Sequence, residues 1–368
     1  MRHPEADTLA LELRSHMADV FEPRDIRRGP DGRSWRFYGR LTAPAADALV
    51  ALRPPFARLG YAPFLADAGA DDLVIAVPAA EVVPAPRRWG LHLGLLLLTA
   101  ATLVVTGALL QAARSAPAPF GVGGILDALA DHGGAGLTFA AALLLILGAH
   151  EMGHYVVARR HGLLISLPYF LPAPPPPLGL GTLGAFISMP SPVPGRAALF
   201  DVALAGPLAG LAVALPILVV GLLTAPLAAL PVAVQPPLVA SGLARLLRGS
   251  LADGMQVDWL TPLLFAAWLG LLVTAINLLP IGQLDGGHLA YAALGPRAVW
   301  LARATWGGLV LLIPFAPTWA VYAVLTLLIG LRHPAPQDDI TPLDSRRRGW
   351  TLVAALLLLL TFSPRPLP

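Results

Sequence analysis

Two histidines and a glutamate stand at the spacing of a metal-binding motif in the first half of the chain. The run AHEMGH at residues 149–154 is an H-E-x-x-H pattern. Residues four apart on a helix share a face, so the imidazoles of His150 and His154 can reach one zinc ion while Glu151 stands beside it. Zinc lowers the pKa of a bound water toward about 7, and a neighbouring carboxylate can pass its proton to a leaving amine. The pattern indicates peptide hydrolysis, with Zn2+ as the cofactor and Glu151 as the general base.

A catalytic zinc site needs a third protein ligand and keeps one position open for water. The chain has no cysteine, so the third ligand must be a carboxylate or an imidazole. The run NLLPIGQLDGGH at residues 277–288 carries Asp285, and Pro280 and the glycines after Asp285 break the helix and let the chain turn inward. We expect Asp285 to be this ligand, although LDGG alone would also suit a loop turn. His288 could be a fourth ligand, an oxyanion stabiliser or a residue at the cytoplasmic boundary, and we favour the last.

Both runs lie in or next to apolar segments, where polar groups without partners are costly and usually functional. Two other classes of function fit a buried metal site, namely a metal transporter and a non-proteolytic zinc-binding scaffold. A transporter would need further carboxylates or histidines along a path, whereas this sequence concentrates them at one place. A purely structural site has no need of a base at Glu151. Hydrolysis is therefore favoured, and these two classes remain the alternative.

The composition of the whole chain indicates a membrane protein. Of its 368 residues 56% are hydrophobic and 13% are charged, and the mean hydropathy is +0.69. These values lie outside the range of ordinary soluble domains. The net charge of +3 does not indicate a nucleic-acid partner, because the arginines are scattered or flank apolar segments and form no basic face. The lack of cysteine excludes disulfides, thiolate metal sites and a cysteine nucleophile.

Apolar segments recur along the chain and predict an all-α polytopic membrane protein with six or seven transmembrane helices. The segments are 91–110, 136–158, 198–223, 261–281, 303–316, 318–331 and 349–362, the last three being short. Arginines flank alternate ends of these segments, at Arg87, Arg88, Arg159, Arg160, Arg196, Arg332, Arg346, Arg347 and Arg348. With a cytoplasmic N-terminus all of them fall on the cytoplasmic side, so we expect a multi-pass protein of a bacterial inner membrane in that orientation. Asp201 is expected to pair with Arg196 or to cap the third segment.

The charge is concentrated before the first apolar segment, which predicts two domains. Residues 1–86 are expected to form a small N-terminal α+β soluble domain, followed by a membrane-embedded metalloprotease domain over 87–368. Within the first domain, alternation over 34–41 indicates a strand, helical spacing over 44–59 a helix, and 61–77 a hairpin. A β-α-β-β module of this kind could also dominate the biology as a partner-binding domain.

A stretch rich in proline and glycine separates the second and third apolar segments, at residues 164–195. It is apolar but cannot form a continuous helix, and lipid-exposed irregular backbone would leave polar groups unpaired. We therefore expect a re-entrant loop or hairpin packed against protein. The alternative is an ordinary cytoplasmic linker.

The motifs together resemble the site-2 protease family of intramembrane metalloproteases, peptidase family M50. HEMGH stands on one span and NLLPIGQLDGG on a later one, and FDVALAGPLAG at 200–210 is similar to the A-G-P element on the family's core helix between the two motifs. The match covers about residues 136–290 and includes a GQLDGG run like that of six-span plant-plastid and bacterial members. There is no PDZ-like insertion.

The resemblance implies a role for each motif residue. His150, His154 and Asp285 would be zinc ligands, Glu151 the general base, and Asn277 a residue close to the scissile peptide bond. The substrates it implies are transmembrane proteins, cut within or near the lipid bilayer as in regulated intramembrane proteolysis. A helical substrate would have to unwind locally, and the Pro-rich hairpin and the Asn277 loop are the expected instruments.

Overall fold

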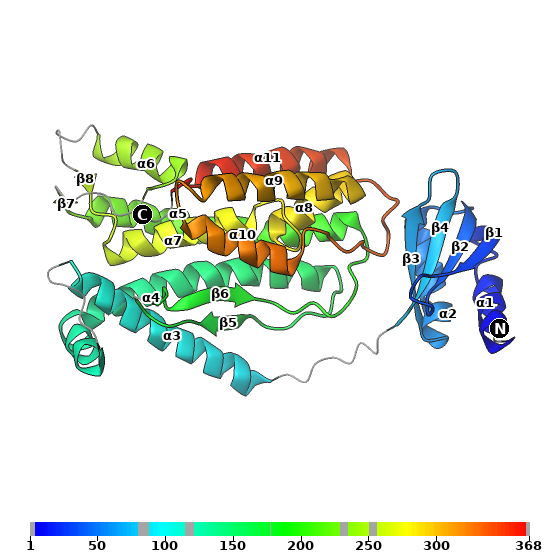
Figure 1. The fold of residues 1–368 in the computed structure, drawn as a ribbon, viewed down its shortest axis with the longest axis horizontal. Coiled ribbons are helices and arrows are strands. Elements are labelled where there is room, and N and C mark those ends of the chain that lie inside the picture. Colours follow the sequence, from blue (N-terminus) through cyan, green and yellow to red (C-terminus); the bar gives the residue numbers. More distant parts are fainter. Residues whose placement is uncertain are drawn as a thin grey trace.

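The structure is a computed structural model that describes residues 4–79, 88–114, 121–176, 178–228, 235–249 and 256–365. It consists of an elongated, mostly helical body with a small sheet-containing module at one end (Figure 1). This agrees with the predicted helical membrane protein carrying a small N-terminal α+β region.

The N-terminal module is a four-stranded antiparallel sheet with two helices. The strands run in the order β1-β2-β4-β3, and the core is made by fully buried side chains that include Phe21, Phe37 and Phe56. The predicted strand, helix and hairpin are confirmed, whereas β1 and α1 were not predicted. The sequence of β1, FEPRDIRR, is dominated by charge because it forms an edge of the sheet, where charged residues oppose aggregation. The elements are α1 (Pro4–Ser15), β1 (Phe21–Arg28), β2 (Trp35–Leu41), α2 (Ala45–Arg58), β3 (Tyr61–Asp67) and β4 (Asp72–Pro78).

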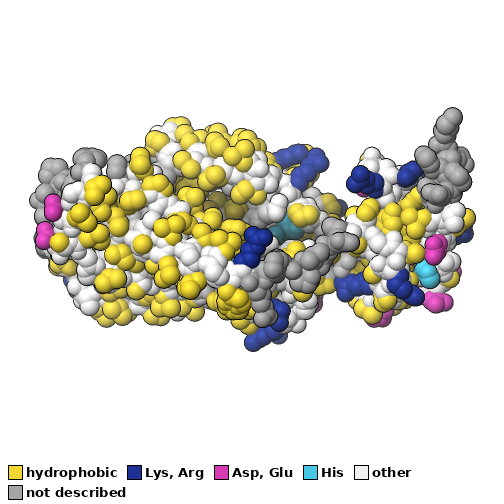
Figure 2. All heavy atoms as spheres, turned by 90° about the horizontal axis from the view of Figure 1, so that it is seen from below, with side chains coloured by type: hydrophobic (Ala, Val, Ile, Leu, Met, Phe, Trp, Pro, Cys, Tyr) yellow, Lys and Arg dark blue, Asp and Glu magenta, His cyan; other side chains and the backbone are white. Residues whose placement is uncertain are grey.

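Among the described residues, three helices of the body are long and apolar enough to cross a membrane, judged by length and composition. They are α3 (Trp89–Ala112), α4 (Gly121–Arg160) and α5 (Arg196–Thr224). The other predicted segments are also helical but shorter, in α7 (Pro262–Asn277), α9 (Ala298–Leu312), α10 (Thr318–Ile329) and α11 (Ser345–Thr361). Two further helices were not predicted, α6 (Leu238–Arg248) and α8 (Asp285–Leu294). Apolar side chains cover most of the visible surface of the body, as a lipid-facing protein requires (Figure 2).

The Pro-rich stretch forms a hairpin that packs against α3. Its strands are β5 (Tyr169–Pro172) and β6 (Thr182–Phe186), paired antiparallel. Thr102 of α3 donates a hydrogen bond to the carbonyl of Gly181 at 2.7 Å. This agrees with the predicted hairpin packed against protein.

A short segment before α11 joins the module to the body. The Leu65 amide of β3 donates to the Gln337 carbonyl (2.6 Å), and the Asp339 amide donates back to Leu65 (3.0 Å). On its other side, the amides of Gln337 and Asp338 donate to the carbonyls of Val193 and Pro194. The segment therefore lies between the edge of the sheet and the chain that leads into α5, and it covers a strand edge that would otherwise be open.

Candidate metal centre

Helix α4, which packs against α5, carries His150, Glu151 and His154, and all three side chains are buried. Glycine on α5 makes the close approach possible. A Cβ at Gly206 would lie 2.1 Å from Nε2 of His154, and one at Gly210 would lie 3.2 Å from Nδ1 of His150. The glycines of the A-G-P element therefore leave room for the two rings. The sequence alone does not show that these glycines accommodate the histidines, because that depends on which helix packs against α4.

Asp285 is the first residue of α8, and it approaches the two histidines from the side opposite to α4. After α7 the chain folds back tightly, with Gly282 at φ +52°. A Cβ at Gly286 would lie 2.0 Å from the carbonyl oxygen of Leu278, and one at Gly287 would lie 2.3 Å from that of Gly282. The two glycines after Asp285 therefore allow the fold-back that directs its carboxylate toward α4.

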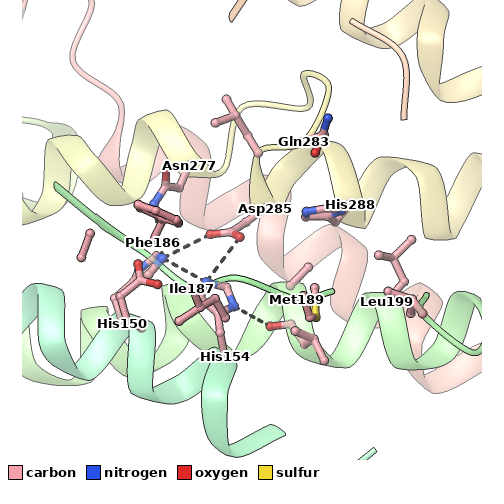
Figure 3. A pocket seen from close by; sticks show the side chains of 16 residues that line it. His150, His154, Phe186, Ile187, Met189, Leu199, Asn277, Gln283, Asp285 and His288 are labelled. Carbon is pink, nitrogen blue, oxygen red and sulfur yellow. Dashed lines mark hydrogen bonds and ion pairs between the residues drawn. The ribbon is translucent and has the colours of Figure 1, made fainter. Parts of the chain in front are cut away.

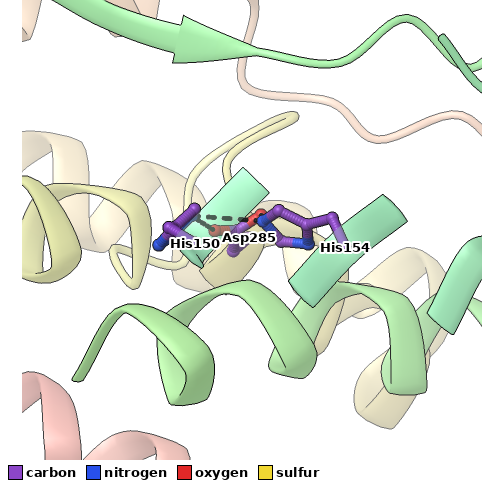
Figure 4. A group of neighbouring side chains, drawn as sticks. All are labelled: His150, His154 and Asp285. Atoms are coloured by element: carbon purple, nitrogen blue, oxygen red, sulfur yellow. Dashed lines mark hydrogen bonds and ion pairs between the residues drawn. The ribbon is translucent and has the colours of Figure 1, made fainter. Parts of the chain in front are cut away.

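The three side chains form a compact group whose candidate ligand atoms all lie within 4.8 Å of one another (Figure 4). Asp285 Oδ2 is 3.2 Å from His150 Nε2, and Asp285 Oδ1 is 3.3 Å from His154 Nε2. His154 Nδ1 lies 2.8 Å from the carbonyl oxygen of Val202, a contact that assigns the proton to Nδ1 and leaves Nε2 free for a metal. Asp285 Oδ2 is buried and has no hydrogen-bond donor among the described residues. Two imidazole nitrogens and such a carboxylate suit a divalent metal ion.

The group lines a cavity of about 200 Å³, and Glu151 and Asn277 line the same cavity. Asn277 Nδ2 is 3.2 Å from His150 Nε2, and its amide points to the group (Figure 3). On the far side the cavity is lined by the end of β6 and the residues after it, including Phe186 and Met189. A carboxylate, an amide and a strand thus surround a space large enough for a stretch of peptide.

Residues 138–311 of the chain match the sequence model of peptidase family M50. These residues belong to peptidase family M50, the site-2 protease family. Three relatives are chloroplast proteins named probable zinc metalloproteases: EGY2 of Arabidopsis thaliana (34% identity over 239 residues), EGY1 of the same plant (34% over 249) and EGY3 of Oryza sativa (30% over 259). The matches cover 62–63% of this chain but only 42–43% of the relatives. No solved structure matches.

His288 of this M50 member lines the same cavity, on the turn of α8 after Asp285. Its Nδ1 is hydrogen-bonded with Nε2 of His333, whose ring stacks on Tyr291 at 4.7 Å between centroids. The sequence favours a place at the cytoplasmic boundary for His288, whereas the structure places the residue in the wall of the metal cavity.

The expected pair between Asp201 and Arg196 is wrong. Both lie on α5, but residues five apart are separated by about 140° around a helix and point to different neighbours. Asp201 is bound by Arg347 of α11, with an Nη2–Oδ2 distance of 2.6 Å. Arg196 Nε instead lies 2.9 Å from Oδ1 of Asp339, and Tyr291 of α8 donates to Oδ2 of the same carboxylate at 2.9 Å. Asp339 therefore ties the start of α5 to α8 on the M50 core.

Proposed function

We propose that the chain is a zinc metalloendopeptidase that hydrolyses peptide bonds in or near the transmembrane segments of other membrane proteins. The observation that carries the proposal is the buried His150, His154 and Asp285 group, with Glu151 in the same cavity. The zinc metalloprotease names of the relatives support the same reaction class. Because the chain spans less than half of their length, its activity and substrates are assigned from its own residues.

Each residue has a distinct task in this reaction. His150, His154 and Asp285 would hold Zn2+, which when bound acts as a Lewis acid toward water and the peptide carbonyl. Glu151 takes a proton from the attacking water and delivers it to the nitrogen of the leaving amine. Asn277 offers an amide donor that can orient the scissile peptide group. The buried setting keeps bulk water away from these groups.

The substrate must present its peptide bond in an extended form, because helical peptide groups are shielded by their own hydrogen bonds. Strand β6 pairs with β5 through one edge, and residues from its end line the cavity. An extended peptide could therefore pair with the other edge of β6, the mode by which many proteins bind unfolded segments. This assigns the Pro-rich hairpin a part in holding the unwound substrate.

The alternative functions are less well supported. A metal transporter needs several metal-binding positions along a path, whereas the described residues form one cluster of His, Asp or Glu side chains that could hold a metal ion. A zinc-binding scaffold would leave Glu151 without a task in a costly buried position. Both alternatives predict no peptide cleavage.

Metal removal tests the reaction class. Purified protein in detergent is treated with a zinc chelator, dialysed, and mixed with a test transmembrane substrate. We expect cleavage to fall to background and to return when Zn2+ is added back, because the Lewis acid is restored to intact ligands. Undiminished cleavage by a sample shown to contain no metal would refute the proposal.

We propose that six or seven of the helices cross the membrane and that the N-terminal module lies in the cytoplasm of a bacterial cell. The proposed division between the two domains, at residues 86 and 87, lies outside the residues that the structure describes. Figure 2 supports this orientation, since basic side chains gather at the end of the body next to the module and acidic ones at the far end. Residues 159–196 would then also lie on the cytoplasmic side.

The lack of cysteine makes this orientation simple to test. Single cysteines are introduced as Ala70→Cys in the module, Leu164→Cys after α4, and Asp131→Cys at the other end of α4. In spheroplasts, a membrane-impermeant maleimide is expected to label only the Asp131→Cys protein, and to label the other two after permeabilisation. Labelling of Ala70→Cys in intact spheroplasts would show that the module lies outside the cell and would contradict the proposed orientation.

A further inference from the structure

A second cavity, of about 610 Å³, lies where the end of α4, the first part of α5 and the start of α11 meet. Its floor is apolar and follows one face of α5 through Phe200, Leu204 and Leu208. The helices that line the cavity with α5 also expose apolar side chains, including Val156 on α4 and Val353 on α11. The cavity therefore opens on a surface that suits lipid chains rather than water.

The rim of this cavity is polar and carries both signs of charge. Asp201 lies 2.6 Å from Arg347 and 3.1 Å from His161, and Asp344 accepts a further hydrogen bond from Arg347. Both carboxylates are thus bound within the protein. The rim is completed by two more arginines and by an indole ring at the start of α11.

Arg160 and Arg346 are the two basic residues of the rim that stay available. Both are exposed, and neither side chain makes a hydrogen bond or ion pair with a described residue. Guanidinium groups bind phosphate oxygens through paired N–H donors. Trp350 lies on the same rim, and tryptophan prefers the boundary between membrane and water.

We propose that this cavity binds a phospholipid with an anionic head group. The phosphate lies between Arg160 and Arg346, and an acyl chain follows the apolar floor along α5 past Leu208. The rim has more arginines than carboxylates, and this excess of positive charge favours an anionic head group. The apolar floor favours a lipid over a free anion. The site is separate from the metal cavity and rests only on the proposed position of this end at a membrane surface. A bound lipid would connect α4, which carries the two histidines, with α11.

Lipid retention by the full chain in detergent tests the proposal by native mass spectrometry. The probes are phosphatidylglycerol and phosphatidylethanolamine with identical acyl chains. The wild type is expected to retain the anionic lipid roughly tenfold better, and Arg160→Ala combined with Arg346→Ala is expected to remove this preference. The matched control is Arg159→Ala with Arg332→Ala, which removes equal charge from the same end but outside the cavity, and it should keep the preference.

A second variant separates a lipid site from an anion site. Leu208→Trp fills the apolar floor without changing charge, so it should lose phosphatidylglycerol, and inorganic phosphate should not displace the lipid from the wild type. Thermal unfolding in detergent verifies that each variant is folded. Equal retention of both lipids by the wild type would overturn the proposal, as would loss of preference in the control pair or displacement of the lipid by phosphate.

Discussion

Replacing Glu151 with Gln is expected to lower the rate of peptide cleavage by about 10²–10⁴-fold, the usual contribution of a general base, while zinc stays bound. The amide has nearly the size of the carboxylate, so the cavity should keep its shape. It cannot, however, accept a proton from water. The measurement is the initial rate of cleavage of a transmembrane substrate, with zinc content determined on the same sample.

The matched control is Asp127→Asn, which changes an exposed carboxylate on the same helix, far from the cavity. This variant should cleave at the wild-type rate. Cleavage by Glu151→Gln within a few-fold of wild type would remove Glu151 from the reaction and leave the cavity without a base.

Asp285→Ala is expected to lose both zinc and cleavage. Its carboxylate oxygens lie 3.2 and 3.3 Å from His150 and His154, and one of them has no other partner in the described structure. Without this ligand, two imidazoles remain, and we expect zinc affinity to fall by at least about 100-fold, more than the loss of a supporting contact would cost. Asp285→Glu should keep part of the metal with a displaced geometry.

The control for this variant is Asn277→Ala, because Asn277 contacts His150 without being an expected ligand. It should retain zinc while cleavage slows. Metal analysis of the purified proteins distinguishes the two cases. Full zinc occupancy in Asp285→Ala would exclude Asp285 as a ligand and make His288 the next residue to test.

Much of the candidate metal centre could be predicted because its signals are local. The spacing of His150 and His154 depends only on helix geometry, and the run of apolar residues before them indicates the helix itself. Asp285 is remote in sequence, yet its place at a helix break next to an apolar segment marks it as an acid that needs a partner. The structure brings all three together.

Other features could not be predicted because they depend on which elements meet. The carbonyl of Val202 faces His154 through backbone geometry alone, so no residue type signals it. The partner of Asp201 is Arg347, which is 146 residues away. Leu65 pairs with the segment around Asp338, although the two regions are separated in sequence by most of the helical body. Neither a strand pattern nor a charge pattern in the sequence predicts this pairing.

Zinc K-edge X-ray absorption of the purified, cleaving wild-type protein tests the metal centre most directly. We expect a first shell of nitrogen and oxygen atoms at about 2.0–2.1 Å, with the multiple-scattering signature of two imidazoles. The imidazole signature should remain in Glu151→Gln, and the zinc signal should be lost in Asp285→Ala. A cleaving wild-type sample without zinc, or with zinc bound by no imidazole, would contradict the assignment of His150, His154 and Asp285 as the site of catalysis.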